Sequence, residues 1–199
     1  HIRLGHFEYL THNKKSNLVP VLLDHVIHNY FPELQNAKDA YTDLFEKMVT
    51  LTARLIAKWQ VFGFAHGVMN TDNMSILGET FDFGPFGFLD DYDPGFICNH
   101  SDHQGRYAFN NQPSIGLWNC HALAAADQID IEKTKEIINN YEKIFYEELT
   151  KLYRRKFGLI RVEKGDLELI EEFLDWMKNH KKDYTNTFRD LSEGILEFS

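Results

Sequence analysis

The sequence predicts a mainly α-helical domain of the α+β class, in which a short β-hairpin lies between two groups of helices. Apolar residues recur at helical spacing in the first third and in the last third of the chain. Residues 61–120, between them, are rich in Gly, Asp and aromatic residues and contain a hairpin signal. A length of 199 residues and a hydrophobic content of 43% are sufficient for a single domain, residues 1–199, with its own core.

Two helices are expected in the first third. The first lies within "LVPVLLDHVIHNYF", residues 18–31, where Pro20 is near the start and its missing N–H costs nothing. Its apolar stripe consists of Leu22, Val26, Ile27 and Tyr30. The second is "YTDLFEKMVTLTARLIAKWQ", residues 41–60, which carries charged residues on the opposite face and is amphipathic. Its stripe consists of Leu44, Met48, Leu51, Leu55, Ile56 and Trp59.

The middle of the chain differs in composition from both ends. Residues 61–120 contain six Asp and one Glu, but Arg106 is their only Lys or Arg. Within them, "MSIL" (74–77) and "TFDF" (80–83) flank a Gly-Glu pair and predict a short hairpin. The remainder is expected to be ordered loop, and long loops inside a compact domain are usually functional.

The last third is expected to be helical from Ile131 onward. One apolar stripe consists of Ile138, Tyr141, Phe145, Leu149 and Leu152. A second consists of Leu167, Ile170, Leu174 and Met177. The helix that carries the second stripe is expected to begin near Asp166, a plausible N-cap. The tail "DYTNTFRDLSEGILEFS", residues 183–199, predicts a further helix with Thr185 or Asn186 near its cap.

The charge and the cysteines narrow the class of protein. A formal net charge of −9 argues against binding to nucleic acid or to an anionic membrane, because repulsion from phosphate would oppose both. The chain contains no run of 18 or more apolar residues, so a transmembrane helix is not predicted. The two cysteines, Cys98 and Cys120, do not form a disulfide framework. We interpret them as reduced, buried thiols, with a redox role for Cys98 as the alternative.

The acidic residues of the central segment need compensation from water or from a cation. Water suffices if the segment is exposed, whereas a divalent cation is needed if it is partly buried, as its aromatic residues suggest. Asp72, Asn73 and Asp82 could supply oxygen ligands, which suit Mg²⁺ or Mn²⁺ rather than Zn²⁺, because the hairpin would return Asp82 close to Asn73. The cluster "CNHSDH", residues 98–103, is too closely spaced for a closed tetrahedral zinc site.

The same residues follow the order of a kinase phosphotransfer site. In kinases, an Asn on the catalytic loop and the Asp of a D-F-G motif hold the metal ions. This chain contains Asp82-Phe83-Gly84, and His66 lies seven positions before Asn73, as in the kinase pattern H-R-D-x-x-x-x-N. The ordered set of His, Asn, hairpin and D-F-G therefore predicts a kinase-like metal site.

The position of the kinase base departs from that pattern. The base is normally two residues after the His, where this chain has Val68. Either the domain is a pseudokinase, or another acid has taken the role. Asp72, next to the predicted metal ligand Asn73, is the obvious replacement.

Longer motifs extend the match to one family. The block "HGVMNTDNMSILGETFDFGPFGFLDDYDPGFICNHSDHQGRYAFNNQP", followed by "GLWN", closely resembles the selenoprotein O / YdiU family. The opening "HIRLGHFEYL" and the late "DYTNTFRDLS" are similar to that family too. The resemblance implies a protein-kinase-like fold and protein AMPylation, in which AMP from ATP is attached to a Ser, Thr or Tyr hydroxyl of a target protein.

The resemblance also implies roles for individual residues. Asp72 would be the catalytic base, and Asn73 and Asp82 would hold Mg²⁺ or Mn²⁺ together with ATP. Arg3, in the "HIR" motif, would contact the ATP phosphates, because a guanidinium suits their geometry. The family's glycine-rich loop, its Lys–Glu ion pair and a second phosphate-binding Arg lie upstream of "HIR", and its redox Cys or selenocysteine lies at the C-terminus.

None of those upstream and C-terminal features is in this chain, which begins at His1. We therefore expect the C-terminal lobe of a kinase-like catalytic domain, without its N-lobe, that is inactive alone and self-associates through its exposed apolar surface. A cytoplasmic location is expected for a bacterial source and a mitochondrial one for a eukaryotic source. A binding module without turnover, an ordinary phosphotransferase and a metal-dependent hydrolase are the alternative functions.

Overall fold

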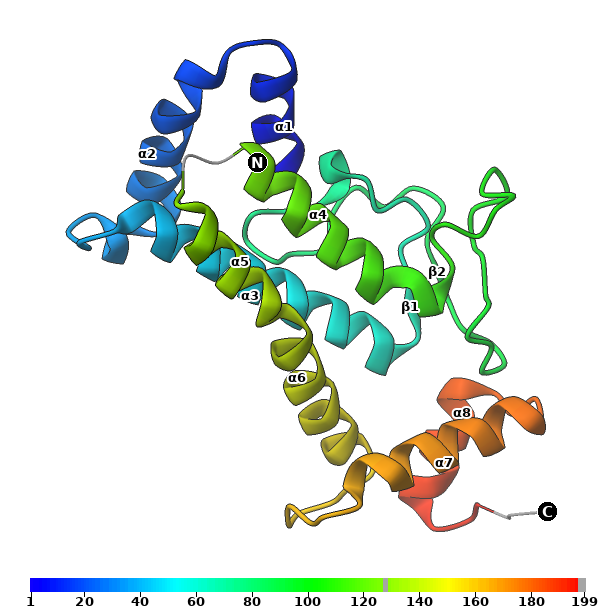
Figure 1. Cartoon of the computed structure of the whole chain (residues 1–199). Helices are drawn as coiled ribbons and strands as arrows, with labels where there is room; N and C mark the ends of the chain where they lie inside the picture. Colours follow the sequence, from blue (N-terminus) through cyan, green and yellow to red (C-terminus); the bar gives the residue numbers. More distant parts are fainter. Residues whose placement is uncertain (127–128, 197–199) are drawn as a thin grey trace.

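A computed structural model describes residues 1–126 and 129–196, and these residues are mainly helical, which confirms the predicted class (Figure 1). The α-helices are α1 (Leu4–His12), α2 (Val19–Tyr30), α3 (Ala40–Phe62), α4 (Gln112–Ala126), α5 (Ile131–Asn139), α6 (Tyr141–Lys156), α7 (Asp166–Asn179) and α8 (Tyr184–Glu193). Two short strands, β1 (Phe64–Ala65) and β2 (Gly87–Phe88), pair in antiparallel fashion with Phe64 opposite Phe88. Among the described residues, no helix is long and apolar enough to cross a membrane.

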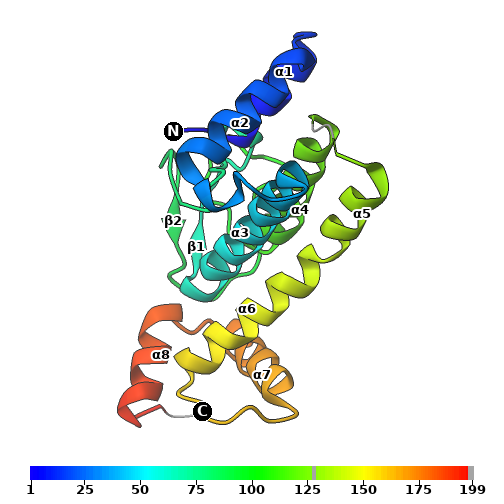
Figure 2. The ribbon, with the colours of Figure 1, turned by 90° about the vertical axis from the view of Figure 1, so that its left-hand side faces the viewer.

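Helix α3 is the centre of the domain. The neighbours α4, α5 and α6 pack along it, while α1 and α2 lie towards one end of the molecule and α7 and α8 at the other (Figures 1 and 2). Of its predicted stripe, Leu51 is half-buried and the remaining members are buried. The helix ends at Gly63, whose φ of 67° turns the chain into β1. The long amphipathic helix and its inward face are therefore confirmed.

The predicted hairpin is wrong. Residues 74–77 and 80–83 do not pair with each other; Ser75 forms an antiparallel bridge with Arg3 instead. The two strands that do pair, β1 and β2, flank this segment on either side. Ser75 is in extended backbone, as a hairpin strand would be, but its pairing partner lies far away in the sequence, where local pattern carries no information.

Helix α4 begins inside the stretch that was expected to be loop. Its buried face carries two amides instead of a continuous apolar stripe. The side chain of Gln112 donates to Phe64 O (2.9 Å) and accepts from His66 N (2.9 Å). The side chain of Asn119 donates to Met69 O (2.9 Å). The helix was missed because these amides serve the backbone of the central loop and interrupt the hydrophobic period that identifies a helix.

The C-terminal helices follow the predicted stripes with different boundaries. A junction at Asn140 divides the first stripe between α5 and α6. The N-cap of α7 is Gly165 rather than Asp166. The carboxylate of Asp166 instead accepts from Glu163 N (3.1 Å) and forms an ion pair with Arg154 (2.6 Å). Asp166 is therefore at the start of the helix, as predicted. Its carboxylate binds Glu163 N and Arg154, and does not cap the N–H groups of the first helical turn.

Helix α8 is capped by Asp183, whose carboxylate accepts from Asn186 N (2.6 Å), and not by Thr185 or Asn186. Residues 197–199 of the predicted tail lie outside the described residues. The aromatic residues of this end form a second buried cluster with α6 and α7, which includes Tyr153 and Tyr184. The C-terminal helices are thus packed onto the end of α3 through this cluster, which includes Val61.

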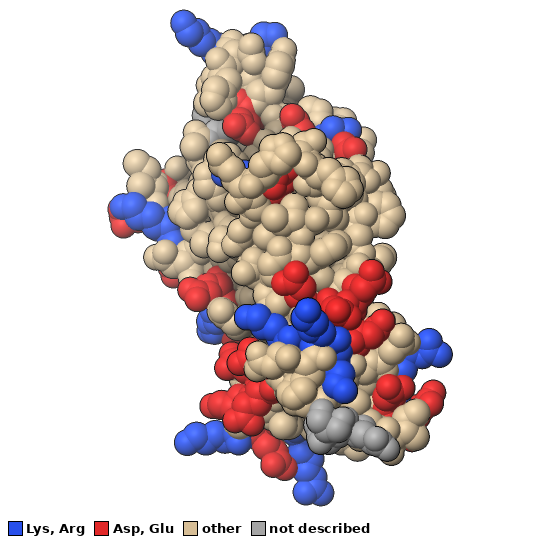
Figure 3. Space-filling model, turned by 90° about the vertical axis from the view of Figure 1, so that its right-hand side faces the viewer, with Lys and Arg blue, Asp and Glu red and all other residues tan. Residues whose placement is uncertain are grey.

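A group of exposed aromatic rings surrounds the small sheet. Phe64 contacts Phe83, Phe86 and Phe88, whose exposed fractions are 57%, 46% and 58%. Figure 3 looks onto the side of the molecule where β2 and the loops lie. A broad area in the middle of this view carries few charged side chains, and the charges are densest around the C-terminal helices. Phe83, which is the Phe of the D-F-G motif, forms with Phe86 and Phe88 an apolar surface that the described residues do not cover.

Candidate active site

The N-terminal residues are paired with the segment that follows the 3₁₀ turn Thr71–Asn73. Leu4 N donates to Met74 O (2.9 Å), and Ile76 N donates to Ile2 O (3.3 Å). The bridge between Arg3 and Ser75 lies between these two hydrogen bonds. Arg3 is therefore held by strand-like pairing and is not at a frayed terminus.

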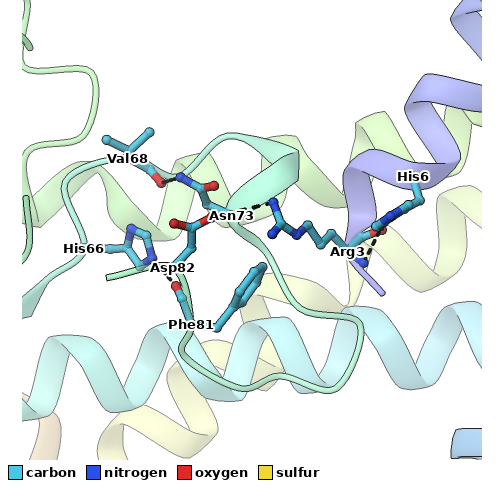
Figure 4. A network of polar contacts seen from close by, with 7 residues as sticks. All are labelled: Arg3, His6, His66, Val68, Asn73, Phe81 and Asp82. Carbon is cyan, nitrogen blue, oxygen red and sulfur yellow. Dashed lines mark hydrogen bonds and ion pairs between the residues drawn. The ribbon is translucent and has the colours of Figure 1, made fainter. Parts of the chain in front are cut away.

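This pairing brings the side chain of Arg3 to Asp82. The distance from Arg3 Nη1 to Asp82 Oδ2 is 3.6 Å, and the guanidinium carbon lies 5.1 Å from the centre of the Phe81 ring. The two side chains are 38% and 44% exposed, so this is a solvent-accessible pair that contributes little to stability. Figure 4 shows Arg3, Asn73 and Asp82 directed towards one region. The structure thus places three of the four predicted site residues together.

Asp82 has an unusual backbone conformation. Its φ is 57°, in the left-handed region that few residues other than Gly, Asn and Asp adopt. Its carbonyl accepts a hydrogen bond from Gly84 N (2.8 Å), which closes a tight turn over Phe83. A strained backbone of this kind fixes the direction of the side chain, and such positions cluster at functional sites.

Asn73 is oriented by the loop that precedes it. Its Nδ2 donates to Val68 O (3.0 Å), so the amide oxygen is the atom left for a ligand (Figure 4). Val68, the residue at the usual kinase base position, therefore acts through its backbone. The side-chain oxygens of Asn73 and Asp82 are hard donors of the kind that Mg²⁺ and Mn²⁺ prefer.

The donor set fits a metal ion that is only partly held by protein. Within the described parts of the chain, no group of three His, Cys, Asp or Glu side chains is arranged to bind a metal ion by itself. Mg²⁺ commonly takes one or two carboxylates, with waters and substrate phosphates completing its shell. Asn73 and Asp82, with Arg3 beside them, match a site for a metal–phosphate complex and not a closed metal centre.

Asp72 faces a different space from its neighbour Asn73. It lies against α1 at Gly5, where a Cβ atom would come within 2.2 Å of Asp72 Oδ1 and 3.0 Å of Asp72 N. Its exposed side lines an open pocket of about 520 Å³, to which Arg106 and Trp118 also contribute. Neither Arg3, Asn73 nor Asp82 lines this pocket. Gly5 was not predicted as a site residue; a glycine in the first turn of a helix is the signal that could have identified it.

His66 braces the loop. It is buried, its backbone N–H donates to Gln112, and its Nε2 lies 3.0 Å from Phe81 O. Burial lowers the pKa of His66, so the neutral ring donates from Nε2 to that carbonyl. This bond ties the start of the loop to the residue before Asp82.

The "CNHSDH" cluster organises a turn. The Asp102 carboxylate accepts from Arg106 N (2.9 Å) and Tyr107 N (2.7 Å), and Asn99 donates to Gly67 O (3.1 Å). Burial raises the pKa of the Cys98 thiol, so that thiol is not activated as a nucleophile. Asn99 and Asp102 therefore hold the backbone of this loop.

Comparison with known proteins assigns the family. A family model described as "Protein adenylyltransferase SelO" matches residues 1–198. Proteins named "Protein nucleotidyltransferase YdiU" are similar: that of Enterobacter sp. (strain 638) is 49% identical over 195 residues, covering 97% of this chain and 41% of the relative. That of Aliivibrio salmonicida (strain LFI1238) is 49% identical over 197 residues, covering 96% and 40%.

A third protein of the same name, from Pseudoalteromonas atlantica, is 48% identical over 195 residues, covering 97% of this chain and 41% of the relative. The chain therefore spans about two fifths of the length of these relatives. The match of the family model covers nearly every residue, including the loop that carries Asp72, Asn73 and Asp82. The chain belongs to the SelO family of protein adenylyltransferases.

Proposed function

We propose that the protein of which this chain is part transfers AMP from ATP to Ser, Thr or Tyr hydroxyls of target proteins, in a reaction that depends on Mg²⁺ or Mn²⁺. One observation carries the proposal: Arg3, Asn73 and Asp82, from separate parts of the sequence, converge on one region in a chain of the SelO family. A guanidinium and two oxygen donors are the groups that a metal-bound triphosphate requires.

Each residue has a defined task in this reaction. Asn73 and Asp82 would hold the metal ion through oxygen atoms, and Arg3 would hold the phosphates that leave. A bound ion would supply positive charge against the charge that develops on pyrophosphate. The acceptor oxygen forms a bond to the α-phosphorus as the bond from that phosphorus to the bridging oxygen breaks. Asp72 accepts the proton of the hydroxyl, and pyrophosphate departs.

The fold proposed for this chemistry is the C-terminal lobe of a protein kinase. Support comes from the order of the parts: a loop braced by His66, a metal-binding Asn73 and then Asp82-Phe83-Gly84, all placed on a helical body. The relatives have more than twice the length of this chain, so further contacts to ATP are expected from the rest of the protein. We therefore expect the isolated chain to have little activity.

The Arg3–Asp82 ion pair favours one alternative, a binding module without turnover. The guanidinium lies 3.6 Å from the carboxylate and offsets the charge that a metal ion would otherwise offset. In that case the loop would hold its shape without metal or nucleotide, and the surface would serve to bind a partner.

The test uses the full-length protein and ATP labelled in either the α- or the γ-phosphate. We expect only the α-label to be incorporated into target protein, and mass spectrometry to show added AMP. Asp82→Asn, which keeps a residue that tolerates positive φ, should abolish incorporation, and Asp72→Asn should lower it by about 100-fold or more. Asp90→Asn, a neighbouring exposed acid, is the matched control and should be active.

Calorimetry separates the alternatives. AMP transfer is supported if the wild type binds MgATP and incorporates the α-label, and if Asp82→Asn does not bind MgATP. Incorporation of the γ-label would indicate an ordinary phosphotransferase. Failure of the full-length protein to bind MgATP at all would contradict the proposal and leave the binding module as the better description.

A further inference from the structure

Arg106 has no task in the reaction proposed above, although it is the sole Lys or Arg in residues 61–120. Its guanidinium carbon lies 5.1 Å from the centre of the Trp118 ring and 5.7 Å from that of Tyr107. Its backbone and that of Tyr107 are fixed by the two oxygens of Asp102. The segment is otherwise acidic, and the position of this cation is fixed by the rings of Tyr107 and Trp118 and by the turn at Asp102.

The guanidinium has no carboxylate partner within the chain as described. None of the ion pairs among residues 1–126 and 129–196 includes Arg106. Two acids line the same pocket, Glu8 and Asp72, and neither forms an ion pair with Arg106. Glu8 accepts a hydrogen bond from the Thr71 hydroxyl. Asp102 uses both of its oxygens on backbone N–H groups. Arg106 therefore keeps N–H groups available for an external anion, and a carboxylate matches its geometry.

The pocket next to Arg106 contains Asp72. It is an open cavity of about 520 Å³, within the range of pockets that take small ligands or a few side chains. Tyr9 and Trp118, which also line it, are both exposed and give it apolar walls. An open pocket with two carboxylates, a guanidinium and aromatic walls can receive an extended segment of another protein.

The position of the pocket agrees with the direction of attack. Arg3, Asn73 and Asp82 do not line it, so it is separate from the region assigned to metal and leaving phosphates. In phosphoryl and nucleotidyl transfer, the incoming and leaving oxygens lie roughly in line on opposite sides of the phosphorus. Asp72, adjacent to Asn73 but facing the pocket, is placed to accept a proton from a hydroxyl that enters there.

We propose that this pocket binds the acceptor segment of the target protein, and that Arg106 selects segments carrying a carboxylate near the modified hydroxyl. The proposal rests on the AMP transfer proposed above. It commits to a protein segment because the family acts on proteins by its description. Since the chain has a net charge of −9, acidic proteins in general are repelled, and only a carboxylate at the right position gains the contact with Arg106.

The experiment uses the full-length protein and pairs of peptides that share one Ser, with Glu or Gln at each position on either side of it. We expect the KM for AMP transfer to be about tenfold lower for Glu than for Gln at one or two positions, with kcat little changed. Arg106→Gln should remove this preference. Arg106→Glu should reverse it, favouring a Lys at the same position. Arg54→Gln, on the exposed face of α3, is the matched control and should keep it.

The reversed preference is a result that a merely structural role of Arg106 would not produce. Equal KM values for Glu and Gln at every position, or a preference that persists in Arg106→Gln, would overturn the proposal. Binding of labelled peptides measured by anisotropy without ATP gives a second reading of the same preference. If binding depends on Glu and on Arg106 but no AMP is transferred, the proposed function fails and the recognition stands. If AMP is transferred but depends neither on Glu nor on Arg106, the proposed function stands and the recognition by Arg106 fails.

Discussion

The helical framework, α3 and the helices packed on it, and the site segment, residues 66–108, are stabilised in different ways. The framework buries apolar side chains at helical spacing, including Leu44, Phe45 and Ile56, each fully buried. The site segment is largely loop, with exposed charges and rings, and is fixed by hydrogen bonds to distant groups such as Gln112 and Asn119. The difference implies that the framework determines stability, and the long-range backbone contacts determine the geometry of the site.

The largest expected effect tests the framework. Phe45→Ala should lower the free energy of unfolding by about 3–5 kcal/mol, because it removes a buried ring from the middle of the core and leaves a cavity. Urea denaturation followed by circular dichroism measures it. Arg54→Ala, exposed on the same helix, should change it by about 0.5 kcal/mol or less. A loss below about 1 kcal/mol for Phe45→Ala would show that α3 is not the main source of stability.

The second effect tests the site segment. Gly5→Ala should reduce AMP transfer by the full-length protein about 100-fold, because the new Cβ atom would lie 2.2 Å from Asp72 Oδ1 and displace the base. Stability should change little, since Ala is the better helix former and offsets part of the strain.

Gly95→Ala provides the matched control for that substitution. Its nearest contact would be Asp93 Oδ1 at 3.3 Å, the tip of an exposed side chain that can move. Activity of Gly95→Ala should equal that of the wild type. Undiminished AMP transfer by Gly5→Ala would mean that the position of Asp72 against α1 is unimportant to catalysis.

The same contrast explains what the sequence could predict. The helices α2 and α3 and the C-terminal stripes follow from apolar spacing, a local property that burial of one face enforces. The proximity of Asn73 and Asp82 was expected from a hairpin that does not exist. In the structure both residues are tied to the loop before them: Asn73 donates to Val68 O, and His66 bonds to Phe81 O, next to Asp82. Arg3 joins them through its pairing with Ser75, which no local pattern can indicate.

Two further features of the site were invisible for the same reason. Gly5 matters only because Asp72 approaches it from another part of the chain. Helix α4 was missed because Gln112 and Asn119, two buried amides, take positions that an ordinary helix would fill with apolar residues. Residues that serve the site disturb the local patterns on which sequence prediction depends.

A third prediction concerns Lys156, a largely buried cation at the C-terminal end of the framework. Its Nζ donates to Val61 O (2.7 Å), and it lies 4.0 Å from the Tyr184 ring centre and 4.1 Å from that of Phe188. Burial lowers the pKa of Lys156 to about 7. The unfolded chain, in which the pKa is near 10.5, therefore binds more protons between about pH 7 and 10.5. Stability from this group must rise with pH across that window.

The comparison of wild type with Lys156→Met measures this effect. From pH 7 to about 9, the wild type should gain stability relative to the variant by up to about 1.4 kcal/mol per pH unit. The faces of the Tyr184 and Phe188 rings and the carbonyl of Val61 stabilise the ammonium, which raises the pKa of Lys156 in the folded protein. The difference in bound protons near pH 7, and with it the slope, should then be smaller than this limit. Lys151→Met, an exposed lysine on the same helix, should show the pH dependence of the wild type. If the free energy of unfolding depends on pH in the same way for Lys156→Met and the wild type, burial does not lower the pKa of Lys156.

The smallest effect concerns the surface on which the two regions differ most. The rings of Phe83, Phe86 and Phe88 are half-exposed around the site segment, whereas the framework presents charged side chains at the C-terminal helices (Figure 3). We expect two copies of the isolated chain to associate through these rings, because burying them removes apolar surface from water.

Replacing all three of these phenylalanines by Ser should raise the dissociation constant of that dimer at least about tenfold, as measured by sedimentation. Ile160→Ser, at a residue that is 97% exposed and outside this group, should leave it unchanged. A wild-type chain that is monomeric at all accessible concentrations would show that the rings shield one another sufficiently. If Ile160→Ser raised the dissociation constant equally, the dimer contact would lie on the framework. The distinction between a charged framework surface and an apolar site surface would then not hold.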